Sequence, residues 1–373
     1  MIQVLKPVYH VEECLDEIRK AMNENWTGLG GRTVVLENLW KEYTGYPNSH
    51  FLNSATAGLQ LAIKILKMDN EWEDGDEIIL PPVTFISCAH SIMHENLKPV
   101  FADVDEYLCL DPLDVVKKIT LRTRAIMFVG MGGNVGEYFE IVEICKKYNL
   151  NLILDASHMA GTRYGGNIVG READVVVNSF QAVKNLNCAD AGMISFKEKK
   201  YDEIARKLSW CGINKDTAQR SQQGAYKWDY DVEYVGHKFH GNSIMAAILI
   251  PQLKYLDKDN SYRRQIAAWY DDNFRNVDKV NPIEIVNGCE SSRHLYIVEL
   301  ENRDNVMNNL YEKNIFCGVH YKCLTEYKMY NYGKGTCNNA ERLQHRIMTL
   351  PIHLDITKND VDFISEQVIA FAQ

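Results

Sequence analysis

The stretch that decides the fold is Ala173-Asp174-Val175-Val176-Val177-Asn178, which runs directly into Ser179-Phe180-Gln181-Ala182-Val183-Lys184. Its run of valines predicts a buried strand, because β-branched residues pack well on a pleated surface. The strand delivers a hydroxyl, Ser179, and then an amine, Lys184. This spacing suits a phosphorylated cofactor that is held at both ends. A single lysine is most often a solvated surface charge, so the interpretation of Lys184 depends on the residues around it.

Apolar runs alternate with helical patterns upstream of this stretch. Continuous apolar strands separated by helices predict an α/β fold with a mostly parallel sheet that is flanked by helices. Ligands of such sheets bind at the carboxyl ends of the strands. Asp155, His158, Ser179 and the turn at Gly130–Gly133 all follow or end predicted strands, so we expect them near Lys184. The predicted strands upstream are Glu77–Leu80, Pro99–Asp105, Ala125–Val129 and Asn151–Asp155.

The length of 373 residues predicts more than one domain, since a single core stops growing below this size. We expect a large sheet domain over residues 1–250 and a smaller C-terminal α+β domain over residues 251–373. A long helix is predicted from Ser243 to Phe274, across this boundary. Residues 213–242 are irregular and rich in aromatic, histidine and glycine residues.

Composition argues against several classes of partner. The net charge of −9 disfavours nucleic acid and anionic membranes. No stretch approaches the ~18 apolar residues of a membrane span, and the first residues lack the apolar core of a signal peptide. The ten cysteines include no Cys-x-x-Cys pair, so we expect reduced thiols and a cytoplasmic protein. Cys317 and His320 have a metal-ligand spacing but no second pair nearby, so no metal is expected.

The residues at the predicted strand ends supply the parts of a pyridoxal phosphate site. The Lys184 amine suits the aldehyde, and the Asp155 carboxylate suits the ring nitrogen. Phe85 is available for the ring face. Thr56, Ala57 and Ser179 offer hydroxyls and amides to the phosphate. The alternative for the segment around Thr56 is an ordinary helix start, capped by Ser54 or Thr56.

A set of segments in order along nearly the whole chain is recognisable. They are Trp26-Thr27-Gly28, Ala55-Thr56-Ala57, Pro82-Val83-Thr84-Phe85, Asp155-Ala156-Ser157-His158, Ser179-Phe180-x-x-x-Lys184-Asn185-Leu186, Gly236-His237-Lys238-Phe239-His240, His320-Tyr321 and Leu350-Pro351-Ile352-His353. With these segments the chain resembles the DegT/StrS family of nucleotide-sugar aminotransferases. The resemblance implies the aspartate-aminotransferase fold, also called fold type I.

The resemblance also implies roles for the cofactor residues. Lys184 is the internal-aldimine lysine, Asp155 pairs with the pyridinium nitrogen, His158 lies beside the cofactor's hydroxyl and Phe85 stacks on the ring. Lys238 stands where many members carry Asn and where the neighbouring subunit reaches the phosphate, which implies a homodimer with shared sites. The residues expected at the phosphate itself are Ala55, Thr56, Ala57 and Ser179.

The expected substrate residues are fewer. Trp26 and Thr27 are expected to close over the sugar, with a plain connector as the alternative for their glycine-rich loop. His320 and Tyr321 are expected at the sugar or at the partner's phosphate, the alternative being ordinary packing. His240 replaces a common Arg, and the turn at Gly130–Asn134 replaces one that usually contains His; both are expected to border the sugar pocket. Asp190 replaces a common Glu, and His294 is interpreted as a core histidine.

The implied reaction is transamination, since the dehydrating members of the family carry His in place of Lys184. Glutamate is the expected donor and converts the cofactor to pyridoxamine phosphate. The expected acceptor is the C3 or C4 keto group of a nucleotide-linked 6-deoxy sugar, in the biosynthesis of amino sugars for lipopolysaccharide O-antigen or another glycan. The alternatives are another fold type I enzyme and an idle, cofactor-binding regulator. The presence of both Lys184 and Asp155 argues against the regulator.

Overall fold

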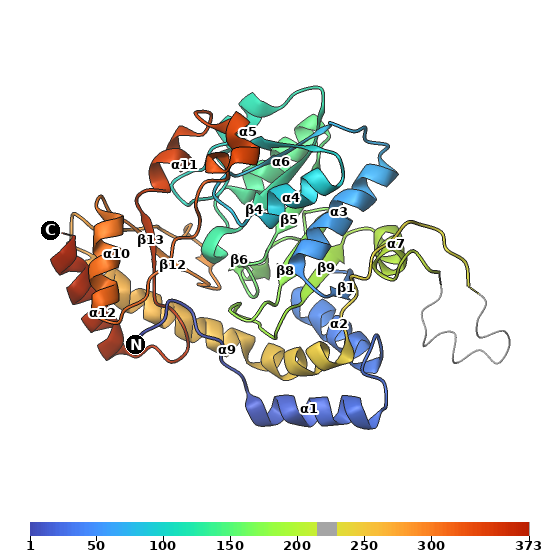
Figure 1. Ribbon diagram of the computed structural model, residues 1–373, viewed down its shortest axis with the longest axis horizontal. Helices are drawn as coiled ribbons and strands as arrows, with labels where there is room; N and C mark the ends of the chain where they lie inside the picture. The colour runs from blue at the N-terminus through green and yellow to red at the C-terminus, as the bar shows by residue number, and fades with distance from the viewer. Residues whose placement is uncertain (215–229, 373) are drawn as a thin grey trace.

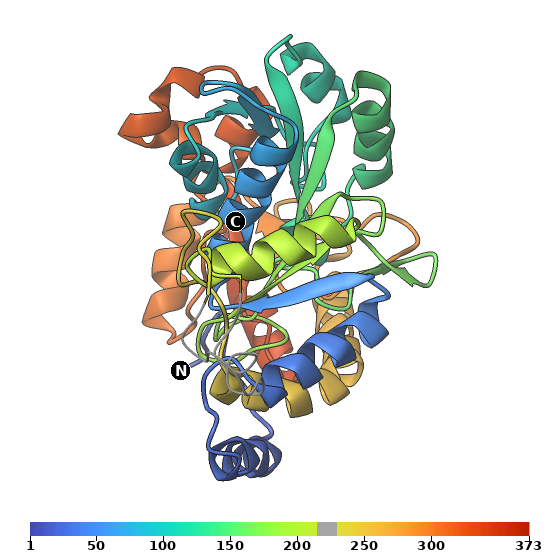
Figure 2. The same cartoon turned by 90° about the vertical axis from the view of Figure 1, so that its right-hand side faces the viewer.

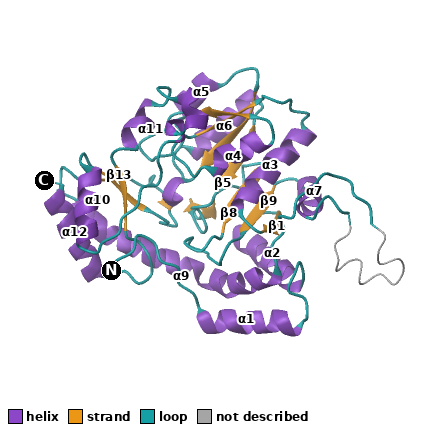
Figure 3. Cartoon of the chain, viewed as in Figure 1, coloured by secondary structure: helices purple, strands orange, loops and turns teal. Residues whose placement is uncertain are grey.

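The computed structural model describes residues 1–214 and 230–372, so half of the irregular region 213–242 lies outside the described residues. Within them, a seven-stranded sheet has the order β1-β9-β8-β5-β4-β2-β3 (Figure 1, Figure 3). Neighbouring strands are parallel except on the two sides of β9, which confirms the mostly parallel α/β sheet. The strands are β1 (Asn48–Leu52), β2 (Glu77–Leu80), β3 (Lys98–Phe101), β4 (Thr123–Val129), β5 (Asn151–Asp155), β8 (Val175–Ser179) and β9 (Gly192–Phe196).

The register of the central strands brings their polar ends together. All five residues of β8 are buried, as expected for a valine-rich strand that packs on both faces. Asp155 lies opposite Val129 of β4 on one side and Val177 of β8 on the other. Val129, Asp155 and Ser179 are each the last residue of their strand, so they meet at one edge of the sheet.

Helices cover this sheet, and α3, α4, α6 and α7 pack directly on its strands. Ser54 caps α3, because its Oγ accepts a hydrogen bond from the amide of Ala57 at 3.1 Å. The helices of this part are α1 (Val11–Asn23), α2 (Gly31–Thr44), α3 (Ala55–Asp69), α4 (Ser87–His94), α5 (Pro112–Lys118), the 3₁₀ helix η1 (Met131–Gly133), α6 (Tyr138–Tyr148) and α7 (Lys199–Ser209). A small separate sheet joins β6 (Arg163–Tyr164), β7 (Asn167–Ile168) and β11 (Cys289–Glu290).

A second core surrounds a three-stranded antiparallel sheet near the C-terminus. Its sheet has the order β10-β12-β13, and α10 and α12 pack together beside it. Its elements are β10 (Asn281–Pro282), β12 (Tyr296–Glu299), α10 (Arg303–Glu312), β13 (Ile347–Leu350) and α12 (Lys358–Phe371). The segment between α10 and β13 holds the 3₁₀ helices η2 (Leu324–Glu326) and η3 (Lys328–Gly333) and the helix α11 (Asn338–Leu343).

The helix α9 (Ser243–Phe274) belongs to both cores. Leu249, Leu253 and Leu256 pack in the large part, whereas Ile266 and Tyr270 pack in the second core. The predicted boundary at residues 250/251 therefore falls inside one continuous helix. The division into two domains stays a prediction, and these contacts favour a boundary further along α9.

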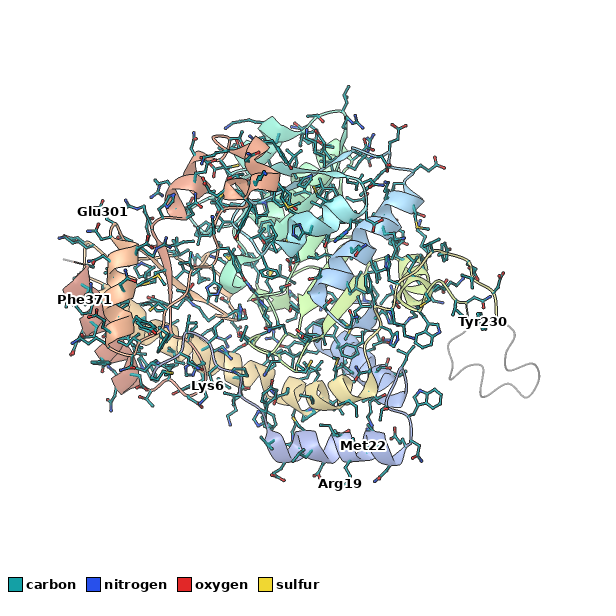
Figure 4. The ribbon with its side chains drawn as sticks, viewed as in Figure 1. Lys6, Arg19, Met22, Tyr230, Glu301 and Phe371 are labelled. Carbon is teal, nitrogen blue, oxygen red and sulfur yellow. The ribbon has the colours of Figure 1, made fainter. Side chains whose placement is uncertain are left out.

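The N-terminal segment links the two parts of the chain. Ile2 pairs with Ile315 beside the second core, although the prediction assigned residues 1–250 to the large domain. The chain then enters α1, which packs along α9 at the periphery of the molecule (Figure 1, Figure 2). Arg19 lies on the outer side of α1 (Figure 4), and Met22 of the same helix is exposed. Among the described residues, no helix combines the length and apolar character that a membrane crossing requires.

Candidate active site

A cavity of about 440 Å³ lies at the carboxyl ends of β4, β5 and β8. The structure brings most of the predicted site residues to its wall: Ala55, Thr56, Phe85, Asp155, His158, Ser179, Lys184, His320 and Tyr321. The sequence analysis did not place the other lining residues there: Ser54, Thr84, Ser87, Val129, Ser157, Gln181, Val183, Asp190 and Ala191. The cavity therefore gathers residues from the starts of α3 and α4, three strand ends and the segment before η2.

Asp155 is held rigidly at the end of β5. Its carboxylate is buried and accepts hydrogen bonds from the amide of Ser157 and the thiol of Cys88, both at 3.0 Å. Burial and the charge of Asp155 raise the pKa of the Cys88 thiol well above its ordinary value, so the sulfur keeps its proton and donates it. Thr84 Oγ1 lies 3.2 Å from the same sulfur. The carboxylate is thus held in a fixed orientation beside the cavity.

Lys184 projects from the turn that follows β8. The turn is closed by the amide of Lys184, which donates to the carbonyl of Gln181 at 2.9 Å. Burial lowers the pKa of the Lys184 amine to about 8, because the charged form loses water, while the charge of Asp155 opposes this shift. A substantial fraction of the amine is therefore neutral near pH 8, as a nucleophile or general base requires.

The start of α3 forms the opposite wall. The amides of Ala55 and Thr56 open this helix, where the first N–H groups have no intrahelical acceptor. Ala57, expected at the phosphate, is buried away from the cavity lining, because its amide is used by the Ser54 cap. A Cβ atom on Gly192 would lie 2.5 Å from the carbonyl carbon of Ser54, so only glycine lets β9 approach this helix start. The arrangement suits an anion.

His158 and Tyr321 form a hydrogen-bonded pair at the cavity wall. The amide of Gly132 donates to His158 Nδ1 at 3.2 Å, so the ring proton of the neutral histidine sits on Nε2. Nε2 then donates to the Tyr321 hydroxyl at 3.2 Å. Burial, followed by the charge of Lys184, lowers the pKa of His158 well below its ordinary value. The Tyr321 ring lies 6.0 Å from that of Phe85.

The turn at Gly130–Asn134 is placed differently from the expectation. Its residues are buried and do not line the cavity. Gly132 has a φ of +62°, which favours glycine, and it supports His158 from behind. The carbonyl of Gly132 accepts the amide of His294 at 3.1 Å. The turn thus supports the site through its backbone.

His294 contacts Lys184, which the sequence analysis did not predict. It is buried, as expected of a core histidine, but its Nε2 lies 3.4 Å from Lys184 Nζ. Its ring centroid lies 4.4 Å from that of His158. His294 directly precedes a strand of the second core, and no local pattern in the sequence relates it to a lysine 110 positions earlier. Only the packing of the two cores could have revealed the contact.

Besides Ala57, four predicted residues do not line the cavity in this chain: Trp26, Thr27, Lys238 and His240. Lys238 is exposed, with Nζ 3.3 Å from the centroid of the Trp210 ring. His240 packs on the same ring at 4.5 Å and donates from Nδ1 to the carbonyl of Gly241 at 2.7 Å. Trp26 is exposed and its Nε1 donates to the carbonyl of Leu29, while the carbonyl of Thr27 accepts the amide of Ser243.

The residues of the cavity fit pyridoxal phosphate. A buried carboxylate, a lysine with a lowered pKa, the open start of a helix and the ring of Phe85 share one cavity at a sheet edge. His320 is neutral here, since burial lowers its pKa to about 4, and its Nδ1 is engaged by Thr349 Oγ1 at 2.8 Å. The fold and this donor set define a pyridoxal-phosphate-dependent aminotransferase of fold type I.

Comparison with known proteins gives the family. The model of the DegT/DnrJ/EryC1/StrS aminotransferase family matches residues 9–369, and the chain belongs to this family. The chain is 31% identical over 376 residues to dTDP-4-dehydro-2,3,6-trideoxy-D-glucose 4-aminotransferase of Saccharopolyspora spinosa, covering 98% of this chain and 96% of that protein. The chain is a sugar aminotransferase, and pyridoxal phosphate is its cofactor.

Solved structures agree with this assignment. The aminotransferase TlmJ from Streptoalloteichus hindustanus has a TM-score of 0.91 and 29% identity, covering 99% of this chain and 98% of that one. The sugar aminotransferase Spr1654 from Streptococcus pneumoniae, in its pyridoxal phosphate form, has a TM-score of 0.89 and 27% identity, covering 100% of this chain and 99% of that one. A pyridoxamine form of Spr1654 is similar to this chain as well.

Proposed function

We propose that this enzyme moves an amino group from glutamate to the C3 or C4 keto group of a nucleotide-linked 6-deoxy sugar, in the biosynthesis of an amino sugar for O-antigen or another glycan. The observation that carries the proposal is the shared cavity of Lys184 and Asp155. The relative from Saccharopolyspora spinosa is named for 4-amination of such a sugar nucleotide, which supports the acceptor class.

The residues of the chain divide the work of this reaction. Pyridoxal phosphate, when bound, supplies a ring that withdraws electrons from the carbon next to the transferred nitrogen. Asp155 would hold the proton on the ring nitrogen, because its carboxylate is fixed by Ser157 and Cys88. Lys184 Nζ takes the proton from the donor carbon in one half-reaction and returns a proton to the sugar carbon in the other.

The phosphate and the substrate are held elsewhere in the cavity. Ala55, Thr56 and Ser179 hold the phosphate through amides and hydroxyls at the start of α3 and the end of β8. His320 and Tyr321 face the same cavity and contact the sugar. The neutral state of His320 suits a hydroxyl-rich substrate, since it leaves an uncharged ring for hydrogen bonding.

We propose a homodimer in which Lys238 and His240 serve the partner's cavity, with Trp26 and Thr27 closing over the sugar. Among the described lining residues, Lys184 is the only Lys or Arg, yet the phosphate, the donor and the nucleotide all carry negative charge. Lys238 presents an exposed ammonium outside its own cavity. Exposed apolar side chains on α1 and α2 offer a surface for the second subunit: Val11, Leu15, Met22, Val34 and Val35.

We also propose that the enzyme works in the cytoplasm. All ten cysteines are free thiols and most are buried, which suits a reducing compartment.

A spectral screen tests the proposed reaction. The enzyme is first converted with glutamate to its pyridoxamine form, which removes the visible band of the lysine-bound cofactor. Thymidine-, uridine- and guanosine-linked 3-keto and 4-keto 6-deoxy sugars are then added in turn. We expect one of them to restore the band and to yield an amino sugar by mass spectrometry. Failure of glutamate to remove the band would contradict the donor, and failure of every keto sugar would contradict the acceptor class.

A further inference from the structure

A short polar chain leads from the second core to the proposed catalytic lysine. Ser292, just before β12, presents its carbonyl to the side chain of Asn185, and Asn185 contacts His294 in turn. His294 Nε2 then faces Lys184 Nζ at 3.4 Å. Asn185 and His294 are both buried, so each polar atom in the chain requires a partner of the right kind.

The hydrogen positions in this chain follow from chemistry. A carbonyl can only accept, so the Asn185 nitrogen must face Ser292, where the distance is 2.7 Å. The same nitrogen donates its second hydrogen to Asn260 Oδ1 at 2.7 Å. Asn185 Oδ1 is therefore the atom that lies 3.0 Å from His294 Nδ1. Because this oxygen accepts only, Nδ1 carries the ring proton.

His294 consequently points a lone pair at the lysine. Burial lowers the pKa of His294 well below its ordinary value, and the charge of Lys184 lowers it further, so the ring is neutral. With the proton on Nδ1, Nε2 is an acceptor. A neutral Lys184 amine must then give one N–H to Nε2, because two facing lone pairs repel. The nucleophilic lone pair of Lys184 is left toward the cavity.

We propose that His294 is a positioning residue for Lys184: its Nε2 accepts a hydrogen from the amine and turns the reactive lone pair toward the cavity. The proposal rests on the proposed role of Lys184 in catalysis.

The backbone around His294 is built to hold this contact. The His294 amide donates to Gly132, and Ser292 Oγ donates to the carbonyl of His158 at 2.6 Å. The Ser292 amide donates to Thr162 Oγ1 at 3.1 Å. The segment before β12 that carries His294 is thus held to the large part at several points. Substitution of the His294 side chain leaves these backbone and Ser292 hydrogen bonds in place, so it removes only the contact with Lys184 and Asn185.

The experiment measures the ionisation of Lys184 in the cofactor-free protein. Trace acetylation with isotope-labelled acetic anhydride, quantified on the Lys184 peptide by mass spectrometry across pH, gives the pKa of this one amine. The other groups that influence the pair are Asp155, which favours the charged lysine, and the neighbours of His294, which are His158, His320 and Arg263. These stay unchanged in every variant.

We expect His294→Leu to lower the Lys184 pKa from about 8 by about one unit, because the buried ammonium loses its acceptor. His294→Gln keeps an acceptor oxygen and should stay near the wild-type value. His294→Phe keeps a ring of similar size without an acceptor, and it replaces the Leu variant if that variant does not fold. His345→Leu makes the same change at an exposed histidine and should leave the value unchanged.

An unchanged pKa in a folded His294→Leu or His294→Phe protein would overturn the proposal. An equal shift in His294→Gln would also overturn it, since packing and not an acceptor would then set the amine. The result is independent of the proposed reaction. If Lys184 were not the cofactor lysine, the pKa shift would persist while the visible cofactor band would survive in Lys184→Ala.

Discussion

Two groups of predicted site residues differ in how their side chains are held: the floor of the cavity, which is Asp155, His158 and Lys184, and a rim outside its lining. On the floor, Asp155, His158 and Lys184 each have fixed partners within the chain. The four predicted residues outside the cavity lining, Trp26, Thr27, Lys238 and His240, are called the rim here. Their side chains are exposed or turned toward Trp210 and the backbone. The difference teaches that the residues proposed for the chemistry are fixed within one chain, whereas the residues of the rim, proposed to meet the sugar nucleotide, do not reach the cavity of that chain.

The largest effect is expected on the floor. Lys184→Ala should abolish the visible band of the lysine-bound cofactor and lower kcat by roughly 10³-fold, because the amine moves the proton. Absorbance and single-turnover kinetics check this result. Lys254→Ala, an exposed lysine on α9, serves as the control. Retention of the band in the Lys184 variant would show that Lys184 does not bind the cofactor.

Asp155→Asn should have the second largest effect. We expect kcat to fall by roughly 10²-fold, because a neutral amide cannot hold the proton on the cofactor ring. The carboxylate is buried, so its effect should not depend on salt. The measurement is kcat at low and high ionic strength. A rate close to that of the wild type would show that Asp155 does not face the ring.

The buried amine of Lys184 should also lower the free energy of unfolding of the cofactor-free protein. The pKa of Lys184 falls from 10.5 in the unfolded chain to about 8 in the folded one, so the unfolded chain binds more protons between these values. The cost is fully present below pH 8 and disappears as the pH rises toward 10.5. Cofactor-free Lys184→Met should therefore be more stable than the wild type at pH 7 by about 3 kcal/mol, with the gap narrowing at higher pH. Urea unfolding at several pH values measures it, and a constant gap would contradict the assignment.

On the rim, Lys238→Ala should weaken binding of pyridoxal phosphate by about tenfold, since one charge-assisted contact to the phosphate is lost. Mixing these subunits with Lys184→Ala subunits should restore activity above the sum of the two separate proteins. Each mixed dimer then has one site with both lysines. The absence of restoration after refolding the mixture would show that the sites are not shared.

Trp26→Ala should have the smallest effect: a few-fold rise in KM for the sugar nucleotide, with kcat unchanged. An exposed ring on a glycine-rich loop contributes to binding but not to the chemical step. Steady-state kinetics with the sugar found by the spectral screen would test this. A fall in kcat would show that Trp26 contributes to the chemical step as well as to binding.

The same contrast explains what the sequence could predict. The valine run before Ser179 and the strand that ends at Asp155 are local patterns, so their strands and the cavity at their ends were predicted well. The helix α2 was missed because its apolar residues do not form one stripe: Val34 and Val35 are exposed while Leu36 and Trp40 are buried. Cys88 and His294 were missed since their contacts with Asp155 and Lys184 join distant segments.

The backbone of Gly132 contacts both His158 and His294. It supplies the hydrogen that sets the tautomer of His158 and the carbonyl that seats the backbone of His294. A change in the backbone at Gly132 would therefore disturb His158 and His294 together, whereas a substitution of the His294 side chain leaves the amide contact to Gly132 in place.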